Sequence, residues 1–448
     1  MTVLVALSFI PVLVMSVLGI RGMPQTLVIA LPLVLLLLHL LLEGPHWQCV
    51  PLYLLALGLL SSLWVGSSPQ RLNITGLRFT GLRFTGLALG TVLLGLSLFL
   101  IWLFPTIKLP TPSGSFLVGT TLHLADDVEV RLWYPAASKT TTYTYLDGVN
   151  RSLFGLPSFI YSHLKGKPTA AFIDAPVRAD KQTFPLIVYV HGADSFAEDN
   201  TFRLIELASQ GFVVAALGHP KPFGDYGITA QDAHDPEQFS ERLATLVVPE
   251  RVRDVHVATA YLETLNKTDS QFKGKLKLSD FGMLGYSLGG SVVTEYCLED
   301  TRCRAIVNLD GSGFGEARAV GVNAAYLQLS QSAALPLEPL TNPQTVAERT
   351  STHYLAEVGD VLQKTQAFQD VYWFRLRGSG HASFTDLAHW TPVRLSPLKT
   401  VMGEGNADTL SRVISDLTVA FFKERLEQEV VFNEVIKSHD DYLAKLLW

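Results

Sequence analysis

The chain opens with a long apolar region and then changes to short apolar runs separated by mixed segments. Four uncharged stretches of at least 20 residues come first, at 1–20, 22–42, 44–70 and 84–107. About 20 helical residues cross a hydrocarbon core of roughly 30 Å, so the pattern predicts about four transmembrane helices. A cleaved signal peptide is disfavoured because no basic segment or small-residue cleavage site accompanies the first stretch. No Asp, Glu, Lys or His lies in the middle of a span except His39, near the end of the second, so we interpret the spans as an anchor.

The charged residues between these stretches predict how the chain crosses the membrane. Arg21 lies in the first loop and Arg71, Arg78 and Arg83 in the third, whereas the second loop holds only Glu43. The positive-inside rule places the arginine loops in the cytoplasm and everything after Lys108 on the other side. A tandem repeat, GLRFT at 76–80 and again at 81–85, falls in the third loop. We interpret it as slippage in a tolerant connector rather than a headgroup-binding loop, because two arginines are a weak lipid signal.

Beyond the apolar region the pattern is that of alternating strands and helices. Residues 115–124 and 128–134 alternate apolar and polar positions, which predicts an antiparallel hairpin. Solid apolar runs of buried-strand length follow at 184–190, 211–217, 281–284, 305–309, 324–329 and 371–376, and helical patterns at 201–209, 250–265, 291–298 and 410–427. Strands that are apolar on both faces favour a mostly parallel sheet flanked by helices, so the fold class is α/β. We expect a transmembrane region at 1–108 and an α/β domain at 109–448.

Composition excludes several functions. Charged residues make up 17% of the chain, and mean hydropathy is +0.26, which rules out a disordered protein. Residues 1–110 carry a net charge of +4 and the remainder −10, with no basic run that could follow nucleic acid. The three cysteines suggest neither a disulfide scaffold nor a metal site. Cys297 and Cys303 could form a disulfide in an extracytoplasmic domain or stay as two thiols.

The run at 281–284 leads into the sequence Gly285-Tyr-Ser287-Leu-Gly289 and then a helix. This strand–turn–helix setting is that of a nucleophile elbow, in which a sharp turn displays the serine. Glycines two residues before and after are needed because a Cβ there would meet neighbouring backbone. The pattern predicts Ser287 as a nucleophile.

A serine nucleophile needs a histidine base oriented by a carboxylate, in the chain order Ser, Asp, His for this arrangement. Of the four histidines after Ser287, only His381 directly follows a predicted strand. Asp310 ends the next strand after the elbow and is the favoured acid. Asp386 is the rival, although it is close enough in sequence to His381 to act as a local cap.

The negative charge that develops on the substrate carbonyl oxygen needs two backbone N–H donors. One comes from the residue after the nucleophile, Leu288, and the other from the loop after an early central strand. That loop reads Val190-His191-Gly192-Ala193, so we expect Ala193 to be the second donor. His191 itself is open to a structural interpretation.

Taken in order, these segments resemble the α/β-hydrolases of the platelet-activating factor acetylhydrolase type, from about residue 132 to 426. The resemblance rests on these segments: Arg131-Leu-Trp-Tyr-Pro, Gly155-Leu-Pro-Ser-Phe, Val190-His-Gly, Gly211-Phe-Val-Val-Ala-Ala with His219-Pro220, Gly285-Tyr-Ser-Leu-Gly-Gly, Leu309-Asp310 and Gly378-Ser-Gly-His381. It implies an α/β-hydrolase fold, a triad of Ser287, Asp310 and His381, and calcium-independent hydrolysis of short or oxidised acyl chains of phospholipids. No cofactor is implied. The apolar front and Tyr286, in place of a histidine common in the family, depart from its pattern.

We therefore expect a multi-pass membrane protein with an extracytoplasmic serine esterase domain acting on a lipid or small ester. A general carboxylesterase or polyester hydrolase and a catalytically silent binding protein are the alternatives, since fold and triad do not fix the acyl group. Acyl length, headgroup, oligomeric state, organism and further roles of the apolar helices are left open by the sequence.

Overall fold

The computed structural model describes residues 2–18, 25–66, 76–151, 157–229, 231–391 and 398–446. The chain forms two compact units. The helical unit comprises Met1–Ile107 with the short segments Phe159–Leu164 and Trp390–Val393, and the sheet unit comprises Lys108–Ser158, Lys165–His389 and Arg394–Trp448.

The helical unit contains five α-helices, among the described residues, in the four apolar stretches. They are α1 (Thr2–Ser8), α2 (Ile10–Leu18), α3 (Gln25–Leu42), α4 (Val50–Gly66) and α5 (Gly76–Leu103), with a 3-10 turn, η1, at Trp47–Cys49. Their shared core includes Val5, Phe9 and Leu52, each fully buried. Their outward faces are also apolar, for example Leu41 at 72% and Val92 at 63% exposed. Helices that are apolar on all sides are typical of a protein core or of a membrane span.

Length and composition support fewer membrane spans than the four that we expected. Within the described residues, Thr85–Leu103 is the one segment long and apolar enough to cross a membrane, whereas Thr2–Val14, Ile29–Leu42 and Trp47–Ser61 are shorter apolar helices. Arg21 and Arg71, on which the predicted orientation partly rests, lie outside the described residues. The GLRFT repeat is helical, as part of α5, and not in a loop as predicted. No proline interrupts 76–103, and helix propagation from an apolar segment is cooperative, so α5 extends back through the repeat.

The sheet unit is built on one mixed sheet with the strand order β11-β10-β9-β8-β7-β5-β6-β2-β1-β4-β3. Neighbouring strands from β6 to β10 in this order are parallel, and β1 pairs with β2 as the predicted antiparallel hairpin. The strands are β1 (Leu117–Ala125), β2 (Val128–Ala136), β3 (Thr142–Thr144), β4 (Pro168–Ile173), β5 (Phe184–Val190), β6 (Val213–Gly218), β7 (Leu276–Tyr286), β8 (Cys303–Leu309), β9 (Ala325–Gln331), β10 (Val371–Leu376) and β11 (Leu443–Lys445).

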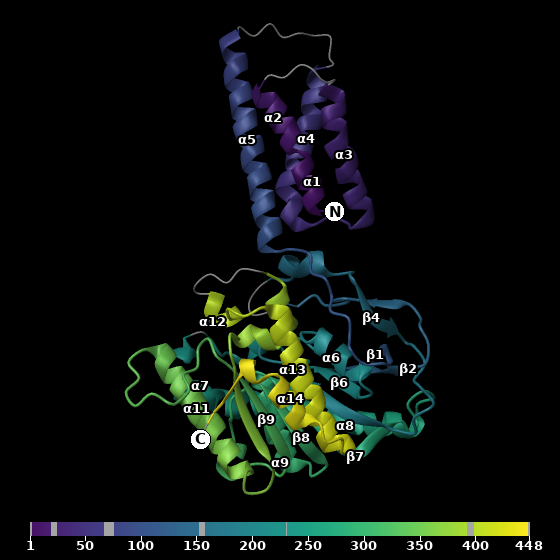
Figure 1. Cartoon of the computed structure of the whole chain (residues 1–448), viewed down its shortest axis with the longest axis vertical. Helices are drawn as coiled ribbons and strands as arrows, with labels where there is room; N and C mark the ends of the chain where they lie inside the picture. Colours follow the sequence, from purple (N-terminus) through teal and green to yellow (C-terminus); the bar gives the residue numbers. More distant parts are fainter. Residues whose placement is uncertain are drawn as a thin grey trace. The chain divides into compact units, whose positions relative to one another are not determined.

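Helices cover both faces of this sheet (Figure 1). One core lies between the sheet and helices α8 (Val248–Thr268), α9 (Leu288–Glu299) and α11 (Val346–Thr365), and the other between the sheet and helices α6 (Thr201–Ser209) and α13 (Ala407–Phe422). The shorter helices are α7 (Pro236–Arg242), α10 (Ala317–Val320), α12 (Leu398–Met402) and α14 (Phe432–Ser438). The layered α/β architecture agrees with the sequence pattern.

A disulfide joins Cys297, near the end of α9, to Cys303 at the start of β8, with their Cα atoms 5.4 Å apart. This resolves the alternative that the sequence left open. The bond closes the turn between the helix after Ser287 and the strand that ends before Asp310. Cys49, in the helical unit, is a buried free thiol.

Candidate active site

Ser287 occupies a sharp turn between strand β7 and helix α9. Its φ angle of 51° is in the left-handed region, which is uncommon for a residue with a side chain. The turn is held because the Ser287 N–H donates to the Leu309 carbonyl (2.9 Å) and the Ser287 carbonyl accepts from Gly290 N–H (2.9 Å). Backbone strain of this kind is characteristic of functional sites. The sharp turn displays the Ser287 hydroxyl above the sheet.

The two predicted elbow glycines stand where the backbone is too close for a side chain. A Cβ on Gly285 would lie 2.3 Å from the Gly289 carbonyl oxygen, and one on Gly289 only 2.1 Å from the Val190 carbonyl oxygen. The second contact joins the start of α9 to the end of β5. It therefore fixes the serine against the loop that was predicted to supply an oxyanion donor.

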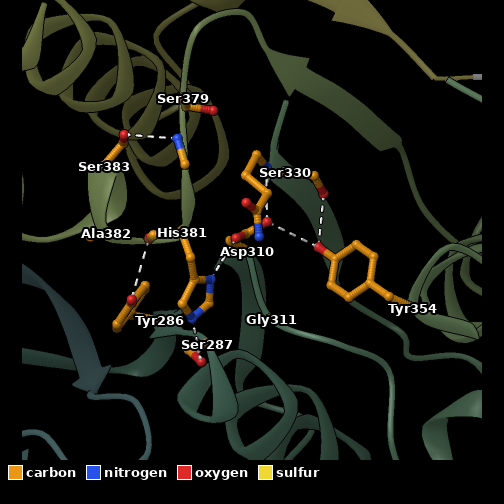
Figure 2. A network of polar contacts seen from close by, with 12 residues as sticks. Tyr286, Ser287, Asp310, Gly311, Ser330, Tyr354, Ser379, His381, Ala382 and Ser383 are labelled. Atoms are coloured by element: carbon orange, nitrogen blue, oxygen red, sulfur yellow. Dashed lines mark hydrogen bonds and ion pairs between the residues drawn. The ribbon is translucent and has the colours of Figure 1, made fainter. Parts of the chain in front are cut away.

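The structure brings Ser287, His381 and Asp310 into one hydrogen-bonded chain (Figure 2). His381 Nε2 lies 2.9 Å from Ser287 Oγ, and His381 Nδ1 lies 2.6 Å from Asp310 Oδ2. A carboxylate can only accept, so Nδ1 carries the proton and Nε2 presents its lone pair to the serine hydroxyl. This is the tautomer that a general base requires.

The Asp310 carboxylate is buried and held from its other side. Its side chain is 1% exposed, and Oδ1 accepts from the Gln331 backbone N–H (2.8 Å) and, at 3.4 Å, from the Tyr354 hydroxyl. Tyr354 comes from α11, a helix that the sequence reasoning did not identify. A helical residue more than 40 positions away carries no sequence signal for this contact.

The rival carboxylate, Asp386, lies elsewhere. It accepts hydrogen bonds from the Tyr145 hydroxyl (3.1 Å) and, more weakly, from the Phe202 N–H (3.4 Å). Burial raises the pKa of Asp386 well above its ordinary value. Its contacts are those of a buried structural acid, so Asp310 is the carboxylate paired with His381.

Tyr286, the residue that departs from the family pattern, packs against the base. Its ring centroid is 5.1 Å from that of His381, and its hydroxyl donates to the His381 carbonyl oxygen at 3.3 Å. Burial raises its pKa well above the ordinary value, so it remains a neutral donor. Tyr286 therefore supports the position of the histidine backbone.

The loop after β5 lies directly beside the nucleophile. A Cβ on Gly192 would be 3.1 Å from Ser287 Cβ, and the Gly192 carbonyl oxygen is held by two donors, His191 Nδ1 (2.7 Å) and Arg251 Nη1 (3.1 Å). In a trans peptide the N–H points away from the carbonyl of the same unit. Holding the Gly192 carbonyl thus fixes the direction of the Ala193 N–H. Leu288, the other predicted donor, is the first residue of α9.

A buried histidine pair lies behind this loop. The rings of His191 and His219 are 5.0 Å apart, and His219 Nδ1 lies 2.8 Å from Asp254 Oδ2. Burial lowers the pKa of both histidines well below the ordinary value, and burial raises that of Asp254 to about 6. His191 is thus neutral, and its Nδ1–H is the donor to the Gly192 carbonyl. The structural interpretation of His191 fits these contacts.

Among the described residues, one group of three histidine and acidic side chains lies close enough together to hold a metal ion. It is His39, Glu43 and His46 in the helical unit. None of these three residues is a member of the triad.

The similarity of this chain to known proteins supports its assignment as a hydrolase. Residues 102–264 match the family model described as platelet-activating factor acetylhydrolase, isoform II, a segment that ends before Ser287. Platelet-activating factor acetylhydrolase of Cavia porcellus is 23% identical over 395 residues, 77% of this chain and 84% of the relative. The Bos taurus protein of the same name is 24% identical over 370 residues, 73% and 79% of the two chains.

The chain is a carboxylic ester hydrolase. Its fold is shared with a solved structure, the ferulic acid esterase from Streptomyces cinnamoneus, at a TM-score of 0.53 and 20% sequence identity. That match covers 72% of this chain and 93% of the esterase. The likeness in fold agrees with the mixed sheet and its flanking helices.

Proposed function

We propose that this ester hydrolase removes short or oxidised acyl groups from phospholipids, as expected of a 1-alkyl-2-acetylglycerophosphocholine esterase, and that Ser287, His381 and Asp310 are its catalytic residues. The observation that carries the proposal is the continuous hydrogen-bonded chain from Asp310 through His381 to a serine on a strained turn. The named relatives supply the substrate class.

The chemistry follows from these contacts. Ser287 Oγ attacks the ester carbonyl while His381 Nε2 takes the hydroxyl proton, and Asp310 stabilises the resulting imidazolium. The proton then passes from Nε2 to the departing alcohol, which leaves the acyl group on Ser287. Water, deprotonated by the same nitrogen, attacks the acyl-enzyme and restores the serine. In our proposal the N–H groups of Ala193 and Leu288 hold the carbonyl oxygen while it is negative.

A chain-length series tests the substrate class. Detergent-purified protein is assayed on p-nitrophenyl acetate and on glycerophosphocholines with acetyl, hexanoyl and hexadecanoyl groups at sn-2, with Ser287→Ala as control. The proposal expects turnover of the acetyl and hexanoyl lipids, little of the hexadecanoyl lipid, and none in the variant. Turnover of the small ester alone would indicate the general carboxylesterase alternative. Absence of both turnover and fluorophosphonate labelling of Ser287 would indicate a silent fold.

We further propose that residues 1–108 form a membrane anchor in which Thr85–Leu103 crosses the membrane, and that residues 109–448, the catalytic domain, lie outside the cytoplasm. Four apolar helical stretches and their exposed apolar faces support the anchor. The Cys297–Cys303 disulfide supports an oxidising compartment.

Glycosylation tests this orientation, because acceptor sequences lie on opposite sides of the proposed membrane: Asn73-Ile-Thr75 on one side, and Asn150-Arg151-Ser152 and Asn266-Lys267-Thr268 on the other. Asn150 is exposed in the sheet unit. In yeast membranes we expect a glycosidase-sensitive shift that disappears in the double variant Asn150→Gln/Asn266→Gln and persists in Asn73→Gln. A shift that depends on Asn73 would place the catalytic domain in the cytoplasm.

A further inference from the structure

The helical unit contains a buried polar cluster that ester hydrolysis does not explain. His39 is in the last turn of α3, Glu43 directly follows that helix, and His46 precedes η1. His39 is 0% and His46 4% exposed, although the surrounding core is made of leucine, valine and phenylalanine. Buried polar groups are costly in such surroundings, so the cluster needs a reason.

Three potential metal ligands converge in it. His39 Nδ1 lies 2.8 Å from Glu43 Oε2, and one nitrogen or oxygen atom from each of His39, Glu43 and His46 lies within 4.8 Å of the other two. Zinc bonds of 2.0–2.2 Å in tetrahedral geometry separate neighbouring ligand atoms by about 3.3 Å. The distance between any two of the three atoms thus needs to change by about 1.5 Å or less for them to share one ion.

The donor types match zinc as well as the distances do. Two imidazoles and one carboxylate are the protein ligands of a common zinc site, with the fourth position left to water or a hydroxyl group. The Thr2 hydroxyl is available there, since it lies 3.0 Å from Glu43 Oε2 and 3.4 Å from His46 Nδ1.

The surroundings also orient the first ligand. Tyr53 Oη lies 3.1 Å from His39 Nε2 and accepts the His46 backbone N–H at 2.9 Å. When Nδ1 coordinates an ion, Nε2 carries the proton and donates it to Tyr53. A hydrogen bond from the second ring nitrogen is the usual support of a metal-bound histidine.

We propose that His39, Glu43 and His46 bind one Zn²⁺ ion. On binding, the lone pair of His39 Nδ1 turns from hydrogen bonding with Glu43 to the metal, and any proton shared between them is released to solvent. The ion would tie the end of α3 to the segment before η1, and Thr2 would bring the start of α1 to the same point. This zinc site is independent of the proposed esterase chemistry, because none of its ligands touches Ser287, His381 or Asp310.

Cobalt spectroscopy and metal analysis test the site on the full-length protein in detergent. After removal of metals by a chelator, Co²⁺ is titrated in, and Zn²⁺ is then used to displace it. We expect one Co²⁺ per chain with the visible absorption of a tetrahedral ion, lost on adding one equivalent of Zn²⁺. His39→Gln and His46→Gln should each lower the affinity at least tenfold.

The matched control is His256→Gln, because His256 forms a similar hydrogen bond with Glu299 (2.7 Å) on the surface of the sheet unit. It should leave cobalt binding unchanged. Fluorophosphonate labelling and the unfolding temperature of each variant report whether it folds. Failure of the unmodified protein to bind Co²⁺ or Zn²⁺ stoichiometrically would overturn the proposal, as would unchanged binding in both His39→Gln and His46→Gln. The cluster would then be a hydrogen-bonded polar contact between helices, and the esterase proposal would stand unaffected.

Discussion

Arg251 offers the sharpest prediction about the proposed oxyanion site, since it acts on the loop and not on the triad. It lies in α8, is 1% exposed, and donates from Nη1 to the carbonyls of Gly192 (3.1 Å) and His191 (3.3 Å). Burial lowers its pKa to about 10, so the guanidinium is still charged at neutral pH. Arg251→Met keeps an unbranched chain of similar length and removes both donated hydrogen bonds.

The expected loss follows from the strength of those bonds. A hydrogen bond to a charged group contributes about 1.5–3 kcal/mol, and each 1.4 kcal/mol lost at the transition state is about a tenfold decrease in rate. His191 still holds the Gly192 carbonyl, so the loss should be smaller than the roughly 10²–10³-fold effect of deleting an oxyanion donor. We expect kcat on p-nitrophenyl acetate to fall about 10- to 100-fold.

Comparing kcat with KM distinguishes a loss of positioning of the Ala193 N–H from general damage to the folded enzyme. KM should change less than about threefold, because the N–H is needed in the transition state more than in the bound ester. Arg253→Met is the matched control on the same helix, where the arginine side chain is 67% exposed, and it should keep its kcat. If Arg251→Met retains kcat within twofold of that control, or raises KM alone, the reasoning about the Gly192–Ala193 peptide is wrong.

Three further predictions concern the triad, the elbow and buried charge. Asp310→Asn should lower kcat about 10⁴-fold, because an amide no longer fixes the His381 tautomer, and a decrease under tenfold on p-nitrophenyl acetate would contradict this. Gly289→Ala, whose Cβ would lie 2.1 Å from the Val190 oxygen, should abolish fluorophosphonate labelling, whereas Gly224→Ala, with nothing within 4 Å, should not. Burial raises the pKa of Asp199 to about 7, so between about pH 4 and 7 the folded state keeps a proton that the unfolded state has released. The free energy of unfolding of the wild-type protein therefore falls as pH rises through that range. The asparagine of Asp199→Asn does not titrate, so the free energy of unfolding of this variant minus that of the wild type should increase by up to about 4 kcal/mol from about pH 4 to pH 7, measured by denaturant titration. A difference that stays constant with pH would refute this prediction.

Much of the sheet could be predicted because its strands are apolar on both faces. The runs at 184–190 and 371–376 and the helix at 201–209 coincide with β5, β10 and α6. Strand β5 is buried along its whole length, so its apolar composition alone marks it as a strand of the core. The short strand β3 at the sheet edge and its neighbour β4 were missed because half-exposed residues such as Thr142–Thr144 carry a weak pattern.

The candidate site was predictable to the extent that its geometry is local. A glycine–serine–glycine turn constrains its own backbone, and a residue directly after a parallel strand lies at the same sheet edge as the elbow, which identified Asp310 and His381. Arg251 and Tyr354 reach the site from helices through long side chains, so no spacing reveals them. The same applies to His39, Glu43 and His46, which come together only because α3 ends and the chain turns back before η1.

Mass spectrometry of the protein, quenched in acid during turnover, can detect the acyl-enzyme that we propose Ser287 forms with a short-acyl phospholipid. With 1-alkyl-2-acetylglycerophosphocholine as substrate, we expect one acetyl group on the peptide that contains Ser287, and none in Ser287→Ala. An acetyl group on another residue, or lipid turnover that persists in Ser287→Ala, would mean that Ser287 is not the nucleophile.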